Sequence, residues 1–315
     1  MSIRWTLALF LVGGALADCP NSEFIQPSCS CKTLFVGTHV VCSNVNSTDT
    51  LRDVFNILVN YRVATLLFRG LRTADPLPSD VFRGMNVNNL HLVDSVFSFR
   101  DRDLPFSGLE ASLTQLDLMN CNVGGEGLAR TNLTHLLHLS EFNVQFVHLD
   151  TVSGDWFGRG PDKIKNLRLD HDEITSVEEG AFRGLTQLQK LSLADNRLQD
   201  VDRGILPRPA SKLKWLDLSY NRLNSLPQDF FSDMPRLKRV VLSGNRFESL
   251  PQNTWQVVWN RLEHLLLKDN PVVCDGNIKW LYERQTPDRL EGTCNSPEEL
   301  QGTELAGLTA DQLQQ

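Results

Sequence analysis

The feature that most constrains the fold is an eleven-residue pattern, L-x-x-L-x-L-x-x-N-x-L, which residues 213–223 (LKWLDLSYNRL) match in full. Two of its leucines, Leu216 and Leu218, are two residues apart. A helix would turn them to different faces, whereas a β-strand points residues i and i+2 to the same side. We therefore expect a short strand with these leucines facing a core and with Trp215, Asp217 and Ser219 facing the other way.

The pattern recurs along most of the chain. Its first apolar position is filled nine times, by Val63, Val87, Leu113, Leu139, Ile164, Leu188, Leu213, Leu237 and Leu262. The steps are 24 to 26 residues, inside the roughly 20 to 29 residues of leucine-rich repeats. One unit cannot bury its leucines alone, so the units must stack. The sequence predicts an α/β solenoid over residues 63–272: a leucine-rich repeat horseshoe of about nine repeats with a parallel concave sheet.

The ninth position of the pattern divides the units into two groups. It is asparagine in the last four: Asn196, Asn221, Asn245 and Asn270. An inward-facing amide both donates and accepts, so it can pair backbone groups that the bend leaves unpaired. In the first five units the same position holds Leu71, Ser95, Cys121, Val147 and Asp172. Leu71 and Val147 cannot donate, so we expect the front units to be less regular.

The segments that return between strands contain a recurring phenylalanine, represented by Phe82, Phe182 and Phe231. We expect these rings to form a buried spine under the outer face, not a cofactor pocket.

The first 17 residues have the composition of a secretory signal peptide, with an apolar run from Leu7 to Val12 and small residues before Asp18. No later stretch approaches the roughly 18 apolar residues of a membrane span. We therefore expect a mature protein that is secreted and extracellular.

Secretion makes the cysteines candidates for disulfides. Cys19, Cys29, Cys31 and Cys42 precede the first repeat and indicate an N-terminal cap over residues 18–62. Their pairing has three alternatives, and their spacing does not match the paired cysteines of a zinc site. Cys121 stands alone at a ninth position, where a weak S–H donor can replace an amide, so we expect a free buried thiol.

The end of the chain, from NPVVCDGNIKWL onward, resembles the C-terminal cysteine cap of extracellular leucine-rich repeat proteins, which usually opens NPxxCDCxxxWL. Gly276 stands where the second cysteine is expected, and the final cysteine is missing too. The resemblance implies a cap over residues 273–315 with one disulfide, between Cys274 and Cys294.

From Cys19 to about Leu308 the chain thus resembles secreted leucine-rich repeat proteins with cysteine caps. More narrowly, it resembles arthropod proteins similar to the non-catalytic subunit of deep-sea shrimp (Oplophorus) luciferase. That resemblance rests on the overall layout and on a CPxxxxIxPxCxC-like front cap formed by Cys19, Pro20, Ile25, Pro27, Cys29 and Cys31. It implies a stabilising or carrier role without luciferase activity, because the catalytic partner in that complex is a separate chain.

Charge and modification signals favour a free extracellular surface. The formal net charge is -7 and no basic stripe exists, which argues against nucleic acid or an anionic membrane as partner. Asn46 and Asn132 begin N-x-[ST] sequences, so we expect glycosylation at both.

The sequence contains no H-E-x-x-H, G-x-S-x-G or P-loop motif. His135 and His138 lack an acidic neighbour on the same short stretch, and the DHDE run at 170–173 does not converge on the repeat, so calcium is disfavoured there. We expect no enzyme activity, cofactor or metal. An enzyme would require Asp117, Arg168 and either His91 or His171 to share one pocket.

The residues between the leucines should form two columns on the concave face. One column is Leu67, His91, Asp117, Asn143, Arg168, Ser192, Asp217, Val241 and Leu266, and the other is Thr65, Asn89, Gln115, Glu141, Asn166, Lys190, Trp215, Arg239 and His264. Trp and Arg dominate many interfaces, so we predict a partner-binding cluster of Arg168, Trp215, Tyr220 and Arg239 on this face. In the alternative, Trp215 only covers its neighbours and Arg239 pairs with Asp217.

Two functions compete on this basis. The first is a secreted protein-binding module or extracellular matrix scaffold that binds an extracellular protein through the concave face. The second is a non-catalytic stabilising or carrier subunit of a secreted enzyme complex, and an ectodomain-like receptor fragment is favoured less.

Overall fold

A computed structural model describes residues 19–100, 104–124, 128, 132–154, 156–157 and 160–313. The expected signal peptide, residues 1–17, lies outside the described residues.

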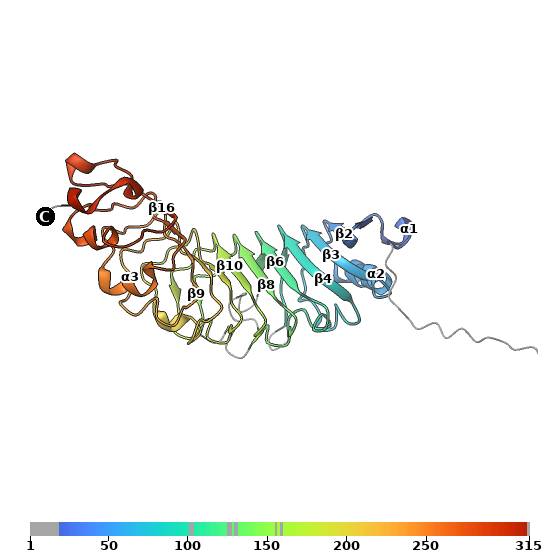
Figure 1. The fold of residues 1–315 in the computed structure, drawn as a ribbon. Coiled ribbons are helices and arrows are strands. Elements are labelled where there is room, and N and C mark those ends of the chain that lie inside the picture. Colours follow the sequence, from blue (N-terminus) through green and yellow to red (C-terminus); the bar gives the residue numbers. More distant parts are fainter. Residues whose placement is uncertain are drawn as a thin grey trace, which may run out of the picture.

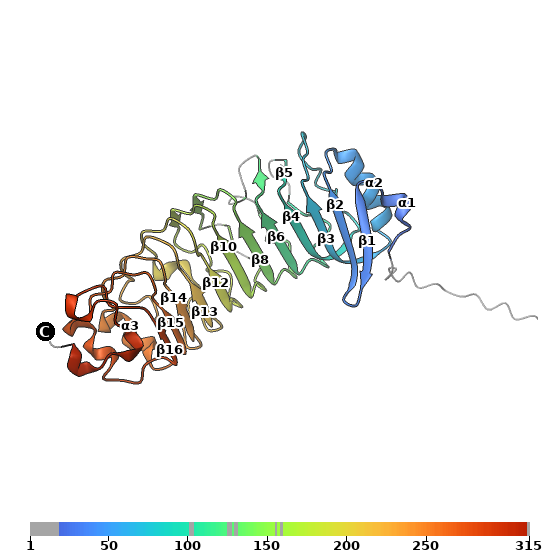
Figure 2. The same ribbon diagram turned by 90° about the horizontal axis from the view of Figure 1, so that it is seen from above.

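Within the described ranges, the chain forms one long curved sheet of 12 strands, ordered β1-β2-β3-β4-β6-β8-β10-β12-β13-β14-β15-β16. Figures 1 and 2 show these strands side by side in a single row, from the blue N-terminal cap to the red C-terminal cap. The strands of this sheet are β1 (Cys29–Leu34), β2 (Gly37–Ser43), β3 (Arg62–Arg69), β4 (Asn86–Val93), β6 (Gln115–Met119), β8 (Glu141–Gln145), β10 (Asn166–Asp170), β12 (Lys190–Ser192), β13 (Trp215–Asp217), β14 (Arg239–Val241), β15 (His264–Leu266) and β16 (Arg289–Glu291). The nine strands from β3 to β15 are the predicted repeats, and the horseshoe fold is confirmed.

The pairing register confirms both predicted columns. Lys190 pairs with Trp215, Trp215 with Arg239, and Arg239 with His264. The neighbouring column follows the same rule, since Arg168 pairs with Ser192 and Asn143. The repeat strands of the described sheet pair in parallel, whereas the β1–β2 hairpin of the cap is antiparallel.

The opposite side of each strand faces the core. Leu216 and Leu218 are 1% and 0% exposed, which bears out the side assigned to them. Behind the strands, Phe82, Phe182 and Phe231 are buried, and edge-to-face or tilted contacts join many of the rings, as between Phe157 and Phe182. The predicted phenylalanine spine is confirmed.

The return segments and the two caps carry little regular structure outside the sheet. Their helices and short strands are α1 (Ser22–Ile25), α2 (Thr48–Leu58), β5 (Val96–Phe97), β7 (Asn122–Val123), β9 (Thr151–Val152), β11 (Ser176–Val177), η2 (Arg203–Ile205), α3 (Gln252–Trp259), η3 (Gly276–Leu281), η4 (Glu298–Leu300), η5 (Leu305–Gly307) and η6 (Ala310–Gln312). The short strands pair in two separate ribbons, β5 with β7 and β9 with β11.

The buried asparagines act as the sequence predicts. Asn221 Nδ2 donates to the carbonyl oxygens of Leu193, Leu218 and Ser219, and its Oδ1 accepts from Leu198 N–H at 3.0 Å. One side chain therefore joins its own turn to the preceding one. The same arrangement is repeated by Asn196, Asn245 and Asn270.

The front units use weaker substitutes. Ser95 Oγ donates to Val93 O and accepts from Leu71 N–H, and the Cys121 thiol lies 3.3 Å from Leu92 O. Cys121 is the free cysteine of the described chain and is buried. Burial raises the pKa of its thiol to about 11, so the sulfur stays protonated and unreactive at neutral pH.

The N-terminal cap closes the open end of the core. The structure forms Cys19–Cys31 and Cys29–Cys42, one of the three pairings left open by the sequence. Cys29 and Cys42 lie opposite each other in the β1–β2 register. Helix α2 then covers the first repeat; its Ser47 N-cap accepts from Thr50 N–H at 3.1 Å.

The C-terminal cap covers the other end. Cys274 bonds to Cys294, and strand β16 continues the sheet beyond β15. Trp280 packs on Trp259 and donates from Nε1 to Leu250 O at 2.9 Å. The tryptophan of the cap motif therefore fixes the cap to the last return segment.

The buried carboxyl group of Asp172 generates a prediction about stability. Asp172 is fully buried, its Oδ1 accepts from Val147 N–H at 2.8 Å, and its Oδ2 has no hydrogen-bond partner. Burial raises its pKa from 3.8 to about 8. Between about pH 4 and pH 8 the folded protein holds this proton while the unfolded chain releases it, so the folded state loses stability as pH rises.

We expect Asp172→Asn to stabilise the protein, because an amide is neutral at every pH and restores the donor found in the later repeats. The advantage should grow by on the order of 1 kcal/mol per pH unit from pH 4 to pH 8. Urea unfolding across this range measures it. Asp195→Asn, on an exposed turn, is the control, and equal pH dependence in both variants would contradict the assignment.

Candidate functional site

Three long side chains from adjacent strands stack on the concave face. The Lys190 ammonium and the Arg239 guanidinium each lie 5.4 Å from the centre of the Trp215 ring, on its two sides. The register of β12, β13 and β14 imposes this order. Such cation–π contacts contribute roughly 0.5 to 2 kcal/mol each, so the three side chains hold one another in place.

The stack leaves polar groups without partners. Among the described residues, neither Lys190 nor Arg239 forms an ion pair with a carboxylate. Arg239 Nε and Trp215 Nε1 have no acceptor. Asp217 Oδ1 accepts instead from Ser219 N–H and Oγ–H. The alternative in which Arg239 pairs with Asp217 is therefore not what the structure contains.

Arg168 lies beside this stack, on strand β10. Its Nε donates to Asp170 Oδ2 at 2.9 Å, and its side chain is 47% exposed. Between Arg168 and the stack is a pocket of about 160 Å³, lined by Glu141, Lys190, Trp215 and other residues of β8 to β13. The structure thus brings Arg168, Trp215 and Arg239 onto one stretch of the concave face.

Tyr220 lies elsewhere. It follows strand β13 by three residues, in the turn, with φ 53° and 52% of its surface exposed. Its ring packs over Gly244, where an added Cβ would meet Tyr220 Cδ1 at 2.4 Å. The structure places Tyr220 on the rim of the sheet and not on the concave face, because a left-handed turn residue points away from the strand plane.

The front half of the concave face differs from the back half. Asp117 lies 2.6 Å from His91 Nδ1 and accepts from Gln115 Nε2 and Asn143 Nδ2. These polar side chains bond to one another. They therefore have fewer groups free to bond to a partner protein than the cations of Lys190 and Arg239 in the back half. The pocket at Arg168 includes neither His91 nor Asp117, and His171 lies in a turn.

Other predicted sites lie away from this cluster. Asn46 and Asn132 are exposed and stay predicted glycosylation sites. Across the described ranges, no three His, Cys, Asp or Glu side chains are gathered as metal ligands.

Sequence reasoning did not select Lys190, although the predicted column already placed it beside Trp215. It also did not select Phe146 and His171, which stack at 4.7 Å on the rim. The sequence feature that could have identified this pair is a ring at the eighth position of the repeat, where most other repeats have Gly, Asp or Asn.

Substitutions on the two sides of β13 should separate folding from surface function. Leu218→Asp buries an unpaired charge and should cost roughly 3 to 5 kcal/mol or more. Trp215→Ala removes a half-exposed ring and its cation–π contacts, and should cost about 1 to 2 kcal/mol. Thermal unfolding of both variants measures the difference, and equal losses of Tm would show that the two faces are wrongly assigned.

The comparisons with known proteins agree with this architecture. A family model described as "Leucine rich repeat" matches residues 137–198 and 211–272. Rat (Rattus norvegicus) osteomodulin is 33% identical over 29% of this chain and 21% of its own length. Fibromodulin of Sus scrofa is 40% identical over 21% of this chain and 44% of its own length. The matches thus span less than half the length of these relatives.

Solved structures show the same fold at low identity. A chain of the Toll–Spatzle complex from Drosophila has a TM-score of 0.53 and 18% identity, covering 78% of this chain and 35% of that chain. A chain of the TLR13–ssRNA13 complex has a TM-score of 0.52 and 20% identity, covering 71% and 34%. Among the described residues, no helix has the length and apolar character that crossing a bilayer needs. The chain folds as a leucine-rich repeat solenoid with a disulfide-bonded cap at each end, and part of it is distantly similar to osteomodulin and fibromodulin.

Proposed function

We propose that this protein is an extracellular protein-binding module, and that the back half of its concave face is the binding surface. The observation that carries the proposal is the stack of Lys190, Trp215 and Arg239, with Arg168 beside it. Disulfide caps and the similarity to osteomodulin and fibromodulin support an extracellular location.

The stack has two properties of an interface hot spot. Its side chains are held by their mutual contacts, so ordering them on binding costs little conformational entropy. Among the described residues its two cations, Lys190 and Arg239, form no ion pair with a carboxylate, so a partner can supply carboxylate or carbonyl oxygens to them and gain charge-assisted hydrogen bonds. Buried Trp and Arg anchors dominate the energetics of many interfaces.

Charge indicates which part of a partner binds here. Although the whole chain carries -7, the cations Arg168, Lys190 and Arg239 lie close together on one face, on strands β10, β12 and β14. An acidic or carbonyl-rich surface of the partner would therefore dock at this place, and the association rate should fall as salt rises.

A capture experiment tests the proposal. Tagged wild-type protein is incubated with native extracellular fluid beside an Arg168→Glu, Trp215→Ala double variant, and captured proteins are identified by mass. The matched control is Phe24→Ala, Arg246→Glu, which removes an exposed aromatic ring and reverses one charge away from the concave face. We expect one partner to be captured by the wild type and the control and lost from the double variant.

Capture of the same proteins by all three baits, or of none by any, would contradict a concave binding surface. A captured enzyme in fixed stoichiometry would favour the second candidate function, a stabilising subunit of a secreted enzyme, which the resemblance to the luciferase subunit supports. A captured matrix protein would favour the scaffold.

A further inference from the structure

The rim of the sheet contains a second feature, independent of the concave face. The eighth residue of every repeat adopts a left-handed backbone conformation, with φ between 50° and 71°. Glycine, asparagine and aspartate tolerate this conformation best. They fill six of the nine positions: Gly70, Asp94, Asn120, Asp195, Gly244 and Asp269.

Three rim positions instead carry rings: Phe146, His171 and Tyr220. A bulky residue in this conformation is strained, and Phe146 is also 52% exposed. His171 covers one face of the Phe146 ring, with the ring planes 10° apart. The opposite face of the Phe146 ring is therefore free on the side of Asn120, where Phe146 lines a pocket.

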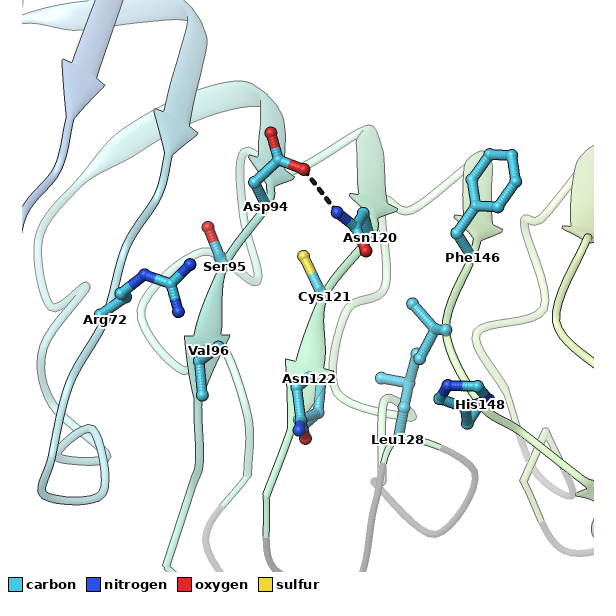
Figure 3. Close-up of a pocket in the computed structure, with 12 residues that line it drawn as sticks. Arg72, Asp94, Ser95, Val96, Asn120, Cys121, Asn122, Leu128, Phe146 and His148 are labelled. Atoms are coloured by element: carbon cyan, nitrogen blue, oxygen red, sulfur yellow. Dashed lines mark hydrogen bonds between the residues drawn. The ribbon is translucent and has the colours of Figure 1, made fainter.

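This rim pocket has a volume of about 530 Å³ and lies over the turns that follow β4, β6 and β8. That size falls among small-ligand sites, which span roughly 300 to 1,000 Å³. Figure 3 shows Asp94, Asn120 and Phe146 along one edge, with Arg72 and His148 at opposite sides. Cys121 and Ser95 lie between them.

The pocket lies where the ladder of ninth-position side chains is broken. In the later repeats the eleventh-position N–H donates to the next ninth-position amide, as Leu198 N–H does to Asn221 Oδ1. The equivalent group here is Val123 N–H, and the next ninth position is Val147, which has no side-chain acceptor. Ribbon β5–β7 also ends at this point, and the next ribbon begins with β9.

The direction of Val123 N–H follows from its neighbours. Asn122 N–H donates to Ser95 O, and Gly124 N–H donates to Phe97 O, both at 2.8 Å on the β5 side. Since successive N–H groups of a strand alternate in direction, Val123 N–H points toward the turn at Val147. A ligand oxygen in the rim pocket could accept from it.

The polar groups of the rim pocket are planar, and two of them hold each other in place. Asn120 Nδ2 donates to Asp94 Oδ1 at 2.6 Å, which leaves the second Asp94 oxygen and Asn120 Oδ1 as acceptors. Asn122 adds a further amide, and Arg72 adds donors without an ion pair to a described carboxylate. Donors and acceptors thus alternate around one exposed aromatic face.

We propose that the rim pocket binds a saccharide. The aliphatic C–H face of a sugar ring would lie on the free face of Phe146, whose π-electrons attract polarised C–H groups. Ring hydroxyls, which both donate and accept, would match Asp94, Asn120 and Asn122, and one hydroxyl oxygen would accept from Val123 N–H. Arg72 suits a hydroxyl or an acidic group at the end of the ligand.

Other ligand classes fit the rim pocket less well. A purely apolar molecule would leave the Asp94 carboxylate and the amides without partners, which is costly. A phosphate group would meet the Asp94 carboxylate against one arginine. An extended peptide is the remaining competitor, and the experiment separates it from a saccharide.

The test uses a panel of immobilised neutral, N-acetylated, uronic-acid and sulfated oligosaccharides, with a panel of immobilised random peptides beside it. The key variant is Phe146→Asn, because asparagine tolerates the left-handed backbone and the substitution removes only the ring. Tyr220→Asn is the matched control, since it makes the same change at a rim position outside the pocket. Both variants should fold, with Tm within about 5 °C of the wild type.

We expect the wild type and Tyr220→Asn to bind at least one saccharide class, and Phe146→Asn to bind it at least tenfold more weakly. Asp94→Asn should also weaken binding and change the preferred saccharide, because it replaces an acceptor by a donor. No saccharide binding by the wild type, equal binding by Phe146→Asn, or binding to peptides alone would overturn the proposal. None of these outcomes depends on the concave face.

Discussion

The side chain at the ninth position of each repeat determines how the turns stack, and the rest of the molecule depends on it. Asn221 contacts three carbonyl groups and one N–H group of successive turns. These backbone groups face the core, where an unpaired one would cost about 1 to 3 kcal/mol. An asparagine at the ninth position of four consecutive repeats therefore makes the back half of the solenoid regular, and that regularity aligns the concave columns.

Alignment explains why the candidate binding cluster is found where it is. Neighbouring strands lie about 4.8 Å apart, so a cation on each side of Trp215 reaches the ring without bending its own strand. In the front half, the concave side chains satisfy one another around Asp117. The concave face thus has a front half whose polar side chains bond to one another. It also has a back half whose cations beside Trp215 form no ion pair within the described chain.

The sequence predicts the periodic part of this structure well, because strand alternation and the repeat length fix which residues share a face. Both concave columns, with Trp215 between Lys190 and Arg239, follow from counting along the repeats. Two kinds of feature do not follow from the sequence: those that depend on the conformation of a turn, and those that depend on which of several neighbours a side chain contacts. Tyr220 belongs to the rim because its φ is positive. Arg239 lies over the ring of Trp215, its register partner, and not against Asp217, which pairs with Val241.

The front half tolerates its irregular turns because a solenoid distributes stability between nearest neighbours. Val147 cannot complete the ladder, and the exposed Phe146 beside it is strained, but these costs fall on the contacts of one repeat with the next. The disulfide-bonded cap and helix α2 hold the repeats on one side, and the asparagine repeats hold those on the other. A pocket can therefore open on the rim without disturbing the register that forms the concave cluster, which allows the two surfaces to change independently.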